Sequence, residues 1–367
     1  MPIPKAPRFV LASGIVTLSI SAFSVLAQSP ARPDISPVLD RSGRVLAEGL
    51  VSLERVSLGG VEQTILIRGG GPDLPILLFL HGGPGGAVIP WVDLFHTPLL
   101  EENFIVVHWD QRGSGSSFST DLTVEDITPE KMVADTLELT DLLRARFGQD
   151  KIFLTGQSWG SALGFMTIAK DSSPYLAYIP TSERVDWDRS MNMGYAWALD
   201  QARANGHADV LAGLEAIAPF DAFDEADLQV QRQALDLYRG GDYHTVGLWD
   251  QYLGYALDGK SPYYTMAEIQ NYIPGLELSS LAIEQADLLE TYDLFASHPS
   301  VDIPVHFVTG AEDRNTPAEL AFEYYEFLEA PAKSFTRIDD AAHMVLYDQP
   351  DAWAEALVEI KNATLAQ

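Results

Sequence analysis

Hydrophobic residues along this 367-residue chain gather in short, uninterrupted runs that alternate with longer stretches of helical spacing. The run Ile76–Leu80 ends in a glycine-rich turn, and the run Phe104–Trp109 ends at Asp110. Continuous apolar strands of this kind are buried on both faces, which is typical of a parallel sheet covered by helices. The pattern therefore predicts an α/β fold with a mostly parallel sheet and helices on both faces. The other predicted elements are a hairpin at 50–58 and 61–68, strands at 151–155, 175–180, 303–309 and 333–338, and helices at 128–147, 161–170, 317–328 and from 350.

The alternation of strands and helices is interrupted once, in a region of helical patterns only that runs from 183 to about 300. Ligands of open α/β sheets gather at the carboxyl ends of the strands. A helical block inserted between two strands is therefore expected to cover the site. We predict a core in two parts, residues 49–182 and 301–367, separated by a helical cap at 183–300.

The N-terminus has the pattern of a secretory signal peptide. Lys5 and Arg8 precede the apolar run Phe9–Leu26, and Ala27 supplies the small residue at a cleavage site. An uncleaved anchor is the alternative, but serines and a glycine interrupt the run and weaken it as a membrane span. We expect cleavage after Ala27, a linker or surface arm at 28–48, and an exported protein, periplasmic or secreted, without stable membrane association.

Charge and cysteine content exclude several classes of function. Acidic residues outnumber basic ones 52 to 23, for a formal net charge of −29. Such a surface repels phosphate backbones, so nucleic acid is not an expected partner. The chain has no cysteine, which excludes disulfides, thiolate metal sites and a cysteine nucleophile.

The central chemical signal is Gly156-Gln157-Ser158-Trp159-Gly160, a G-x-S-x-G pattern between a predicted strand and a predicted helix. A serine nucleophile is held there on a tight turn, and the two glycines relieve the crowding that the turn creates. The alternative is a purely structural glycine turn. The flanking strand and helix favour Ser158 as the nucleophile of a hydrolase.

A second glycine-rich turn, His81-Gly82-Gly83-Pro84-Gly85-Gly86, follows the strand at 76–80. Acyl transfer needs backbone N–H groups aimed at the developing oxyanion, and glycines allow the main chain to approach the substrate. We predict donors at Gly83 and Trp159, with Gly82 as a further candidate. A dinucleotide or phosphate loop is the alternative, but the spacing fits neither motif.

The acid and base are predicted from chain order, which in this fold is serine, then carboxylate, then histidine. Asp313 follows the strand at 303–309, with Glu312 as the neighbouring alternative, and His343 follows the last strand. In such a triad the histidine takes the serine proton while the carboxylate fixes its tautomer. The sequence has no metal motif, and this apparatus requires no cofactor.

Five motifs together resemble the proline iminopeptidase branch of the α/β-hydrolases. They are HGGPGG at 81–86, WDQRGSGS at 109–116, GQSWGS at 156–161, VTGAED-x-NTP at 308–317, and AHM at 342–344. The resemblance implies a serine hydrolase with a helical cap that acts on small molecules or short peptides. It also implies the triad Ser158, Asp313 and His343, and a bracing role for Asp110-Gln111-Arg112 beside the site.

In that family, acids of the cap hold the free amino end of the substrate. The family's W-x-x-W-E stretch is absent here, and the nearest counterparts are Glu183 and the pair Trp249-Asp250, which become candidate substrate-binding residues. Three functions stay open. An aminopeptidase acting on short peptides is the first, and an esterase or lactonase that uses the same triad on neutral esters is the second. A non-catalytic binding protein on a hydrolase scaffold is the third.

Overall fold

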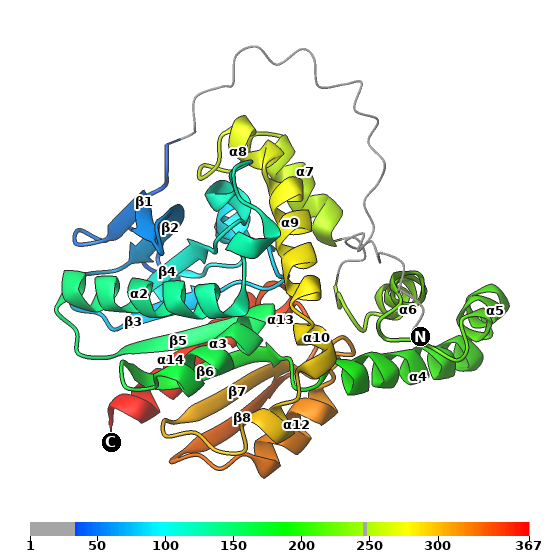
Figure 1. Cartoon of the computed structure of the whole chain (residues 1–367). Helices are drawn as coiled ribbons and strands as arrows, with labels where there is room; N and C mark the ends of the chain where they lie inside the picture. Colours follow the sequence, from blue (N-terminus) through cyan, green and yellow to red (C-terminus); the bar gives the residue numbers. More distant parts are fainter. Residues whose placement is uncertain (1–33, 245–247, 367) are drawn as a thin grey trace.

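Eight strands of the described chain form one sheet in the order β1-β2-β4-β3-β5-β6-β7-β8 (Figure 1). The computed structural model describes residues 34–244 and 248–366, so the predicted signal peptide and the start of the linker lie outside the described residues. β2 is antiparallel to β1 and β4, and all pairs from β4–β3 to β7–β8 are parallel. The predicted mostly parallel sheet is confirmed. The strands are β1 Leu50–Leu58, β2 Val61–Gly69, β3 Ile76–Leu80, β4 Ile105–Asp110, β5 Ile152–Ser158, β6 Tyr175–Glu183, β7 Val305–Gly310 and β8 Lys333–Ile338.

Successive residues of the central strands point to opposite faces, and each face is covered by its own helices. In β3, Ile76 and Leu78 join one hydrophobic cluster, whereas Leu77 and Phe79 join the other. The first cluster contains residues of α2 (Pro129–Phe147), α3 (Trp159–Lys170) and α12 (Ala318–Phe327). The second contains residues of α1 (Pro98–Glu101), α13 (Val345–Asp348) and α14 (Pro350–Leu365). The strands are therefore buried on both sides, which explains their uninterrupted apolar runs.

Helices fill the chain between β6 and β7, where the sequence predicts a cap. Figure 1 shows α4 to α6 extending to the side of the sheet, while α7 to α9 rise above it. The chain leaves the sheet later than expected, because β6 continues to Glu183 instead of ending near Pro180. The helices are α4 Trp187–Asn205, α5 Ala208–Ala216, α6 Glu225–Leu237, α7 Leu248–Leu257, α8 Met266–Gln270, α9 Tyr272–Gln285, α10 Leu288–Thr291 and α11 Leu294–Ser297.

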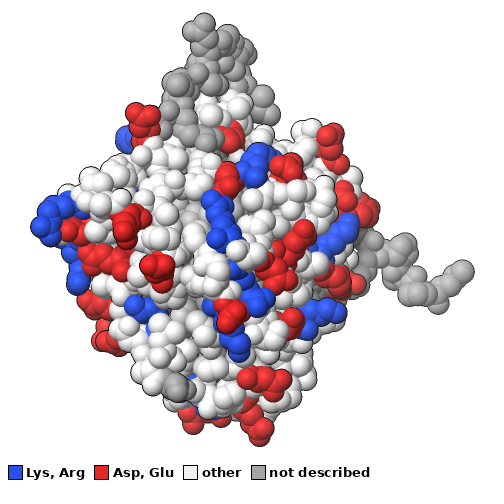
Figure 2. Space-filling model, turned by 90° about the vertical axis from the view of Figure 1, so that its left-hand side faces the viewer, with Lys and Arg blue, Asp and Glu red and all other residues white. Residues whose placement is uncertain are grey.

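The charged surface is mixed on the face shown in Figure 2, where acidic and basic side chains lie interspersed. Ion pairs elsewhere in the described chain include Arg41 with Glu102 at 2.9 Å and Arg146 with Glu54 of β1. Among the described residues, every helix is too short or too polar to cross a membrane.

A buried ion pair joins the N-terminal hairpin to the rest of the core. The Arg112 guanidinium donates to both carboxylate oxygens of Asp135 in α2, at 2.8 and 2.7 Å. Gln63 of β2 donates to the same carboxylate at 2.7 Å, and Arg112 also donates to the carbonyl of Leu58 at the end of β1. One guanidinium therefore connects β1, the segment after β4, and α2.

Replacing Asp135 by alanine should lower the free energy of unfolding by about 3–5 kcal/mol, because it leaves the Arg112 charge buried without its partner. Asp141, on the same helix, is a matched control, since its pair with Arg144 at 2.8 Å lies at the surface. Asp141→Ala should cost less than about 1 kcal/mol. Urea unfolding measures both values, and equal losses in the two variants would contradict this role of the Arg112–Asp135 pair.

Candidate active site

Ser158 lies at the junction of β5 and α3, in a conformation that ordinary residues avoid. Its backbone has φ 55° and ψ −115°, and its side chain is almost fully buried. Both flanking glycines are needed for packing. A Cβ at Gly156 would overlap the carbonyl oxygen of Gly160, and a Cβ at Gly160 would overlap that of Leu80 in β3. The G-x-S-x-G pattern thus corresponds to three backbone segments in direct contact.

Asp313 and His343 meet at the carboxyl ends of β7 and β8. His343 Nδ1 lies 3.0 Å from Asp313 Oδ2, and Asp313 is fully buried. The carboxylate also accepts hydrogen bonds from the backbone N–H groups of Asn315 and Thr316, at 3.0 and 2.9 Å, and from the Thr316 hydroxyl at 2.8 Å. A carboxylate held in this way orients the imidazole with its proton on Nδ1, which leaves Nε2 free to act as a base.

His343 is held against the Ser158 turn through its backbone. Its carbonyl accepts hydrogen bonds from the side chains of Gln157, at 3.3 Å, and Ser182, at 2.9 Å. Within the described chain, no hydrogen bond joins Ser158 Oγ to His343 Nε2. Such bonds are often long or poorly aligned before substrate binds.

The predicted oxyanion turn packs directly on the Ser158 turn. A Cβ at Gly82 would lie 2.5 Å from Gln157 Oε1 and 3.4 Å from Ser158 Cβ. Gly83 has φ +112°, a value that favours glycine. Trp159 begins α3, so its N–H is one of the free donors of a helix N-terminus. Gly82 and Trp159 therefore adjoin Ser158, and the role of all three predicted donors in catalysis stays a prediction.

A hydrogen-bond network that the sequence left unspecified, apart from the bracing role implied for Gln111, holds the predicted oxyanion turn in place. His81 Nδ1 donates to the carbonyl of Gly82 at 2.9 Å, while His81 Nε2 accepts from the backbone N–H of Gln111 at 3.1 Å. The Gln111 side chain donates to the His81 carbonyl and accepts from the Trp159 indole. Burial lowers the pKa of His81 to about 4. The imidazole is therefore neutral near neutral pH, as its acceptor role requires.

A second connection missed in the sequence comes from the segment after α6. The backbone N–H of His343 donates to the carbonyl of Gly241, and that of Arg314 donates to the carbonyl of Gly240, both at 2.9 Å. A Cβ at Gly240 would lie 2.9 Å from both Arg314 Cβ and the Trp197 ring. This Gly-Gly pair thus bridges the loops that carry Asp313 and His343. The doubled glycine is the only sequence signal of this contact.

The three candidate substrate-binding residues fall in two places. Glu183 ends β6 beside the Ser158 turn, and its carboxyl group is buried against the Ser161 hydroxyl at 3.0 Å. Trp249 and Asp250 lie in the first turn of α7, and the contacts of their side chains are outside the described structure. The described part of the chain shows no cluster of three or more ligating side chains that could hold a metal ion.

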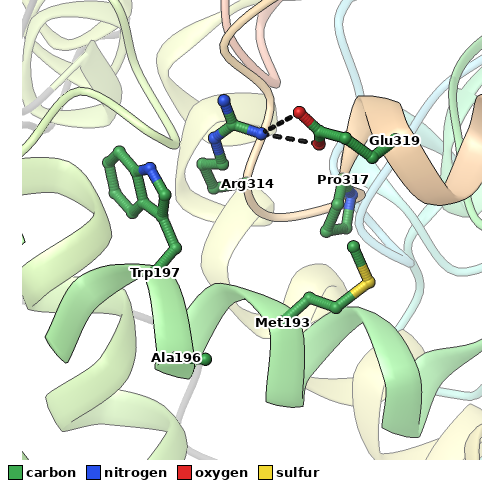
Figure 3. Close-up of a pocket in the computed structure, with 6 residues that line it drawn as sticks. All are labelled: Met193, Ala196, Trp197, Arg314, Pro317 and Glu319. Atoms are coloured by element: carbon green, nitrogen blue, oxygen red, sulfur yellow. Dashed lines mark hydrogen bonds and ion pairs between the residues drawn. The ribbon is translucent and has the colours of Figure 1, made fainter. Parts of the chain in front are cut away.

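Behind the Asp313 loop lies a pocket of about 260 Å³ between α4 and α12 (Figure 3). Arg314 spans it, with its guanidinium over the Trp197 ring at 5.6 Å and paired with Glu319 at 2.6 Å. Because Arg314 follows Asp313 directly, this pocket borders the loop that positions the predicted acid. Its lining is Met193, Ala196, Trp197, Arg314, Pro317 and Glu319.

Comparison with known proteins gives a family model and several curated relatives. Residues 75–350 match the model described as alpha/beta hydrolase fold. The chain is 30% identical over 312 residues to the probable aminopeptidase YbaC of Bacillus subtilis. The aligned region covers 84% of this chain and 96% of that protein. It is 36% identical to the proline iminopeptidase of Xanthomonas citri over 104 residues, or 28% of this chain and 31% of that protein.

Solved structures with the same fold include a proline iminopeptidase and a proline iminopeptidase-related protein. A proline iminopeptidase-related protein of Thermus thermophilus superposes with a TM-score of 0.59 at 22% identity, over 86% of this chain and 98% of that one. Proline iminopeptidase of Mycobacterium smegmatis gives a TM-score of 0.59 at 18% identity, over 86% and 99% of the two chains. At these identities the likeness shows a common fold.

Gly82→Ala should lower kcat for an aryl ester such as p-nitrophenyl acetate by at least about tenfold, because the new Cβ displaces the oxyanion turn from Ser158. Gly213→Ala is the matched control, since a Cβ at that position in α5 meets no atom within 4 Å. The control should keep kcat within about twofold and gain slightly in helix stability. Wild-type kcat in Gly82→Ala would contradict the placement of this turn in the site.

Proposed function

Because the chain belongs to the α/β-hydrolase family, we propose that it is a serine hydrolase in which Ser158, His343 and Asp313 form the catalytic triad. The observation that carries this proposal is the pairing of His343 Nδ1 with buried Asp313, beside a serine at positive φ on a strand-to-helix turn. A serine in this conformation is costly in backbone strain, and such strain clusters at functional sites.

The proposed reaction proceeds through an acyl-enzyme. His343 Nε2 takes the proton of Ser158 Oγ as the oxygen attacks the substrate carbonyl. The tetrahedral oxyanion accepts hydrogen bonds from the backbone N–H groups of Trp159 and Gly83, with Gly82 as a further donor. The imidazolium then protonates the leaving amine or alcohol, and a water molecule releases the acyl group by the reverse sequence. Asp313 stays ionised and holds the imidazole throughout.

We propose that the substrates are short peptides from which the enzyme removes a small N-terminal residue, as in proline iminopeptidases. Support comes from the names of the relatives, above all the probable aminopeptidase that matches most of this chain. Recognition of a free amino end requires a carboxylate, because a desolvated cation needs a paired anion. Of the predicted residues, Asp250 in α7 is the candidate for this role, since the Glu183 carboxyl contacts Ser161.

Hydrolysis of small neutral esters or lactones is the second candidate activity. It is favoured by the placement of Glu183, whose carboxyl group is buried beneath the nucleophile turn and does not offer a free anion to an amine. An esterase would use the same triad without any site for a charged amino end.

The two activities are separated by a panel of prolyl and alanyl arylamides, their N-acetylated forms, and short-chain aryl esters. An aminopeptidase should hydrolyse the free arylamides, and N-acetylation of the substrate should lower kcat/KM by at least about tenfold. Turnover should be lost in Ser158→Ala, because removal of a triad member lowers the rate by several orders of magnitude. Turnover of esters alone would assign an esterase. Undiminished turnover in Ser158→Ala would reject the triad.

We further propose that the protein is exported and cleaved after Ala27, because of the charged and apolar pattern of its first residues. N-terminal sequencing of protein recovered from outside the cytoplasm should then begin at Gln28. An intact N-terminus in membrane-bound protein would instead indicate a retained anchor.

A further inference from the structure

The hydroxyl group of Ser161, in the first turn of α3, lies among three polar atoms. Ser161 Oγ is 2.6 Å from the carbonyl oxygen of Ser158 and 3.0 Å from Glu183 Oε1, and it accepts a hydrogen bond from the backbone N–H of Arg184 at 3.1 Å. Ser161 is fully buried, and Glu183 is 2% exposed. Because bulk water does not reach it, this hydroxyl forms its hydrogen bonds with these three protein atoms.

The single hydroxyl proton of Ser161 constrains the protonation state of Glu183. The Ser158 carbonyl oxygen can only accept, so at 2.6 Å the single hydroxyl proton of Ser161 must lie on that contact. The hydroxyl oxygen then has no proton left for Glu183 Oε1. The 3.0 Å contact is consequently a hydrogen bond only if the Glu183 carboxyl group carries a proton and donates it to Ser161.

The surroundings of Glu183 favour the same neutral form. Burial raises the pKa of Glu183 well above its ordinary value, although the contact with Ser161 and the nearby Arg184 charge oppose this shift. The other ionisable groups that face it are the phenols of Tyr178, Tyr292 and Tyr324, whose own pKa values are raised by burial. No ion pair joins Glu183 to Arg184 in the part of the chain that the structure describes. A protonated carboxyl group in an apolar site can serve as a hydrogen-bond donor.

The carbonyl that Ser161 contacts belongs to the same peptide unit as the N–H of Trp159. A peptide unit is planar, so a hydrogen bond that fixes the Ser158 carbonyl also fixes the direction of that N–H. Ser158, which precedes that N–H, has a strained backbone with φ 55°. Such a conformation persists only where its surroundings hold it. A hydrogen bond to a carbonyl oxygen also polarises the amide, which strengthens its N–H as a donor.

We propose that Ser161 and Glu183, the latter as a neutral acid, are positioning residues that aim and polarise the Trp159 N–H toward the oxyanion. A chain of hydrogen bonds then runs from the Glu183 carboxyl group through the Ser161 hydroxyl to the Ser158–Trp159 peptide unit. The inference rests on the proposed serine-hydrolase mechanism, but it does not depend on whether the substrate is an amide or an ester. It gives Glu183 a role other than substrate binding.

The test compares the variants Ser161→Ala, Glu183→Gln and Glu183→Leu, with p-nitrophenyl acetate as substrate. An aryl trifluoromethyl ketone serves as inhibitor, because it forms a tetrahedral oxyanion with serine. Ser161→Ala and Glu183→Leu should lower kcat about tenfold and weaken ketone binding by a similar factor, with KM within about twofold. Glu183→Gln should stay within about threefold of wild type, since its amide N–H still donates to Ser161.

Thr167→Val is the matched control, because the Thr167 hydroxyl makes a similar bond in the same helix, to the Leu163 carbonyl at 2.7 Å, away from the site. It should lower the melting temperature without changing kcat or ketone affinity. If Ser161→Ala does not fold, Ser161→Cys replaces the hydroxyl by a weak donor and should act in the same direction.

Two results would overturn the proposal. In the first, Ser161→Ala and Glu183→Leu lower the melting temperature but leave kcat and ketone affinity unchanged, as a merely structural pair would. In the second, Glu183→Gln is as damaging as Glu183→Leu, which would mean that the ionised carboxylate acts. Failure of the mechanism itself would appear differently, as ester turnover that persists in Ser158→Ala.

Discussion

The strained backbone of Ser158 is the constraint on which the rest of the site depends. The turn can form only where β3, β5 and α3 approach so closely that neither Gly156 nor Gly160 has room for a side chain. Hydrophobic cores on both faces of the sheet hold these three elements together. Burial of the strands thus supplies the energy that keeps one serine in an unfavourable conformation, with its side chain at the carboxyl edge of the sheet.

Around this turn, buried groups are neutral where a neighbouring hydrogen bond requires them to be. His81 accepts a backbone N–H through one ring nitrogen and donates through the other, which only the neutral ring can do. Glu183 can bond to Ser161 only as an acid. Asp313 differs, because it accepts hydrogen bonds from two backbone N–H groups and a hydroxyl. Its carboxyl group faces the imidazole that would become charged in the reaction.

Local patterns were sufficient to predict the parallel sheet and to place the serine, the aspartate and the histidine at or after the carboxyl ends of its strands. The G-x-S-x-G pattern depends on residues close in sequence, and the order of serine, carboxylate and histidine along the chain is a rule of this fold. Contacts between distant segments could not be predicted in this way. The bond from His343 to Gly241, the link from His81 to Gln111, and the burial of Glu183 against Ser161 depend on how loops meet in space. The predicted strand at 175–180 also ended too early, since Thr181 to Glu183 are polar yet buried in β6.

Capture of the acyl-enzyme tests the central claim most directly. The protein is mixed with p-nitrophenyl acetate, quenched in acid within milliseconds, and digested for mass spectrometry. One acetyl group is expected on the peptide that contains Ser158. It should disappear as the ester is consumed and should never form in Ser158→Ala. Acetylation at another residue, or turnover without any acetyl intermediate on Ser158, would contradict this claim.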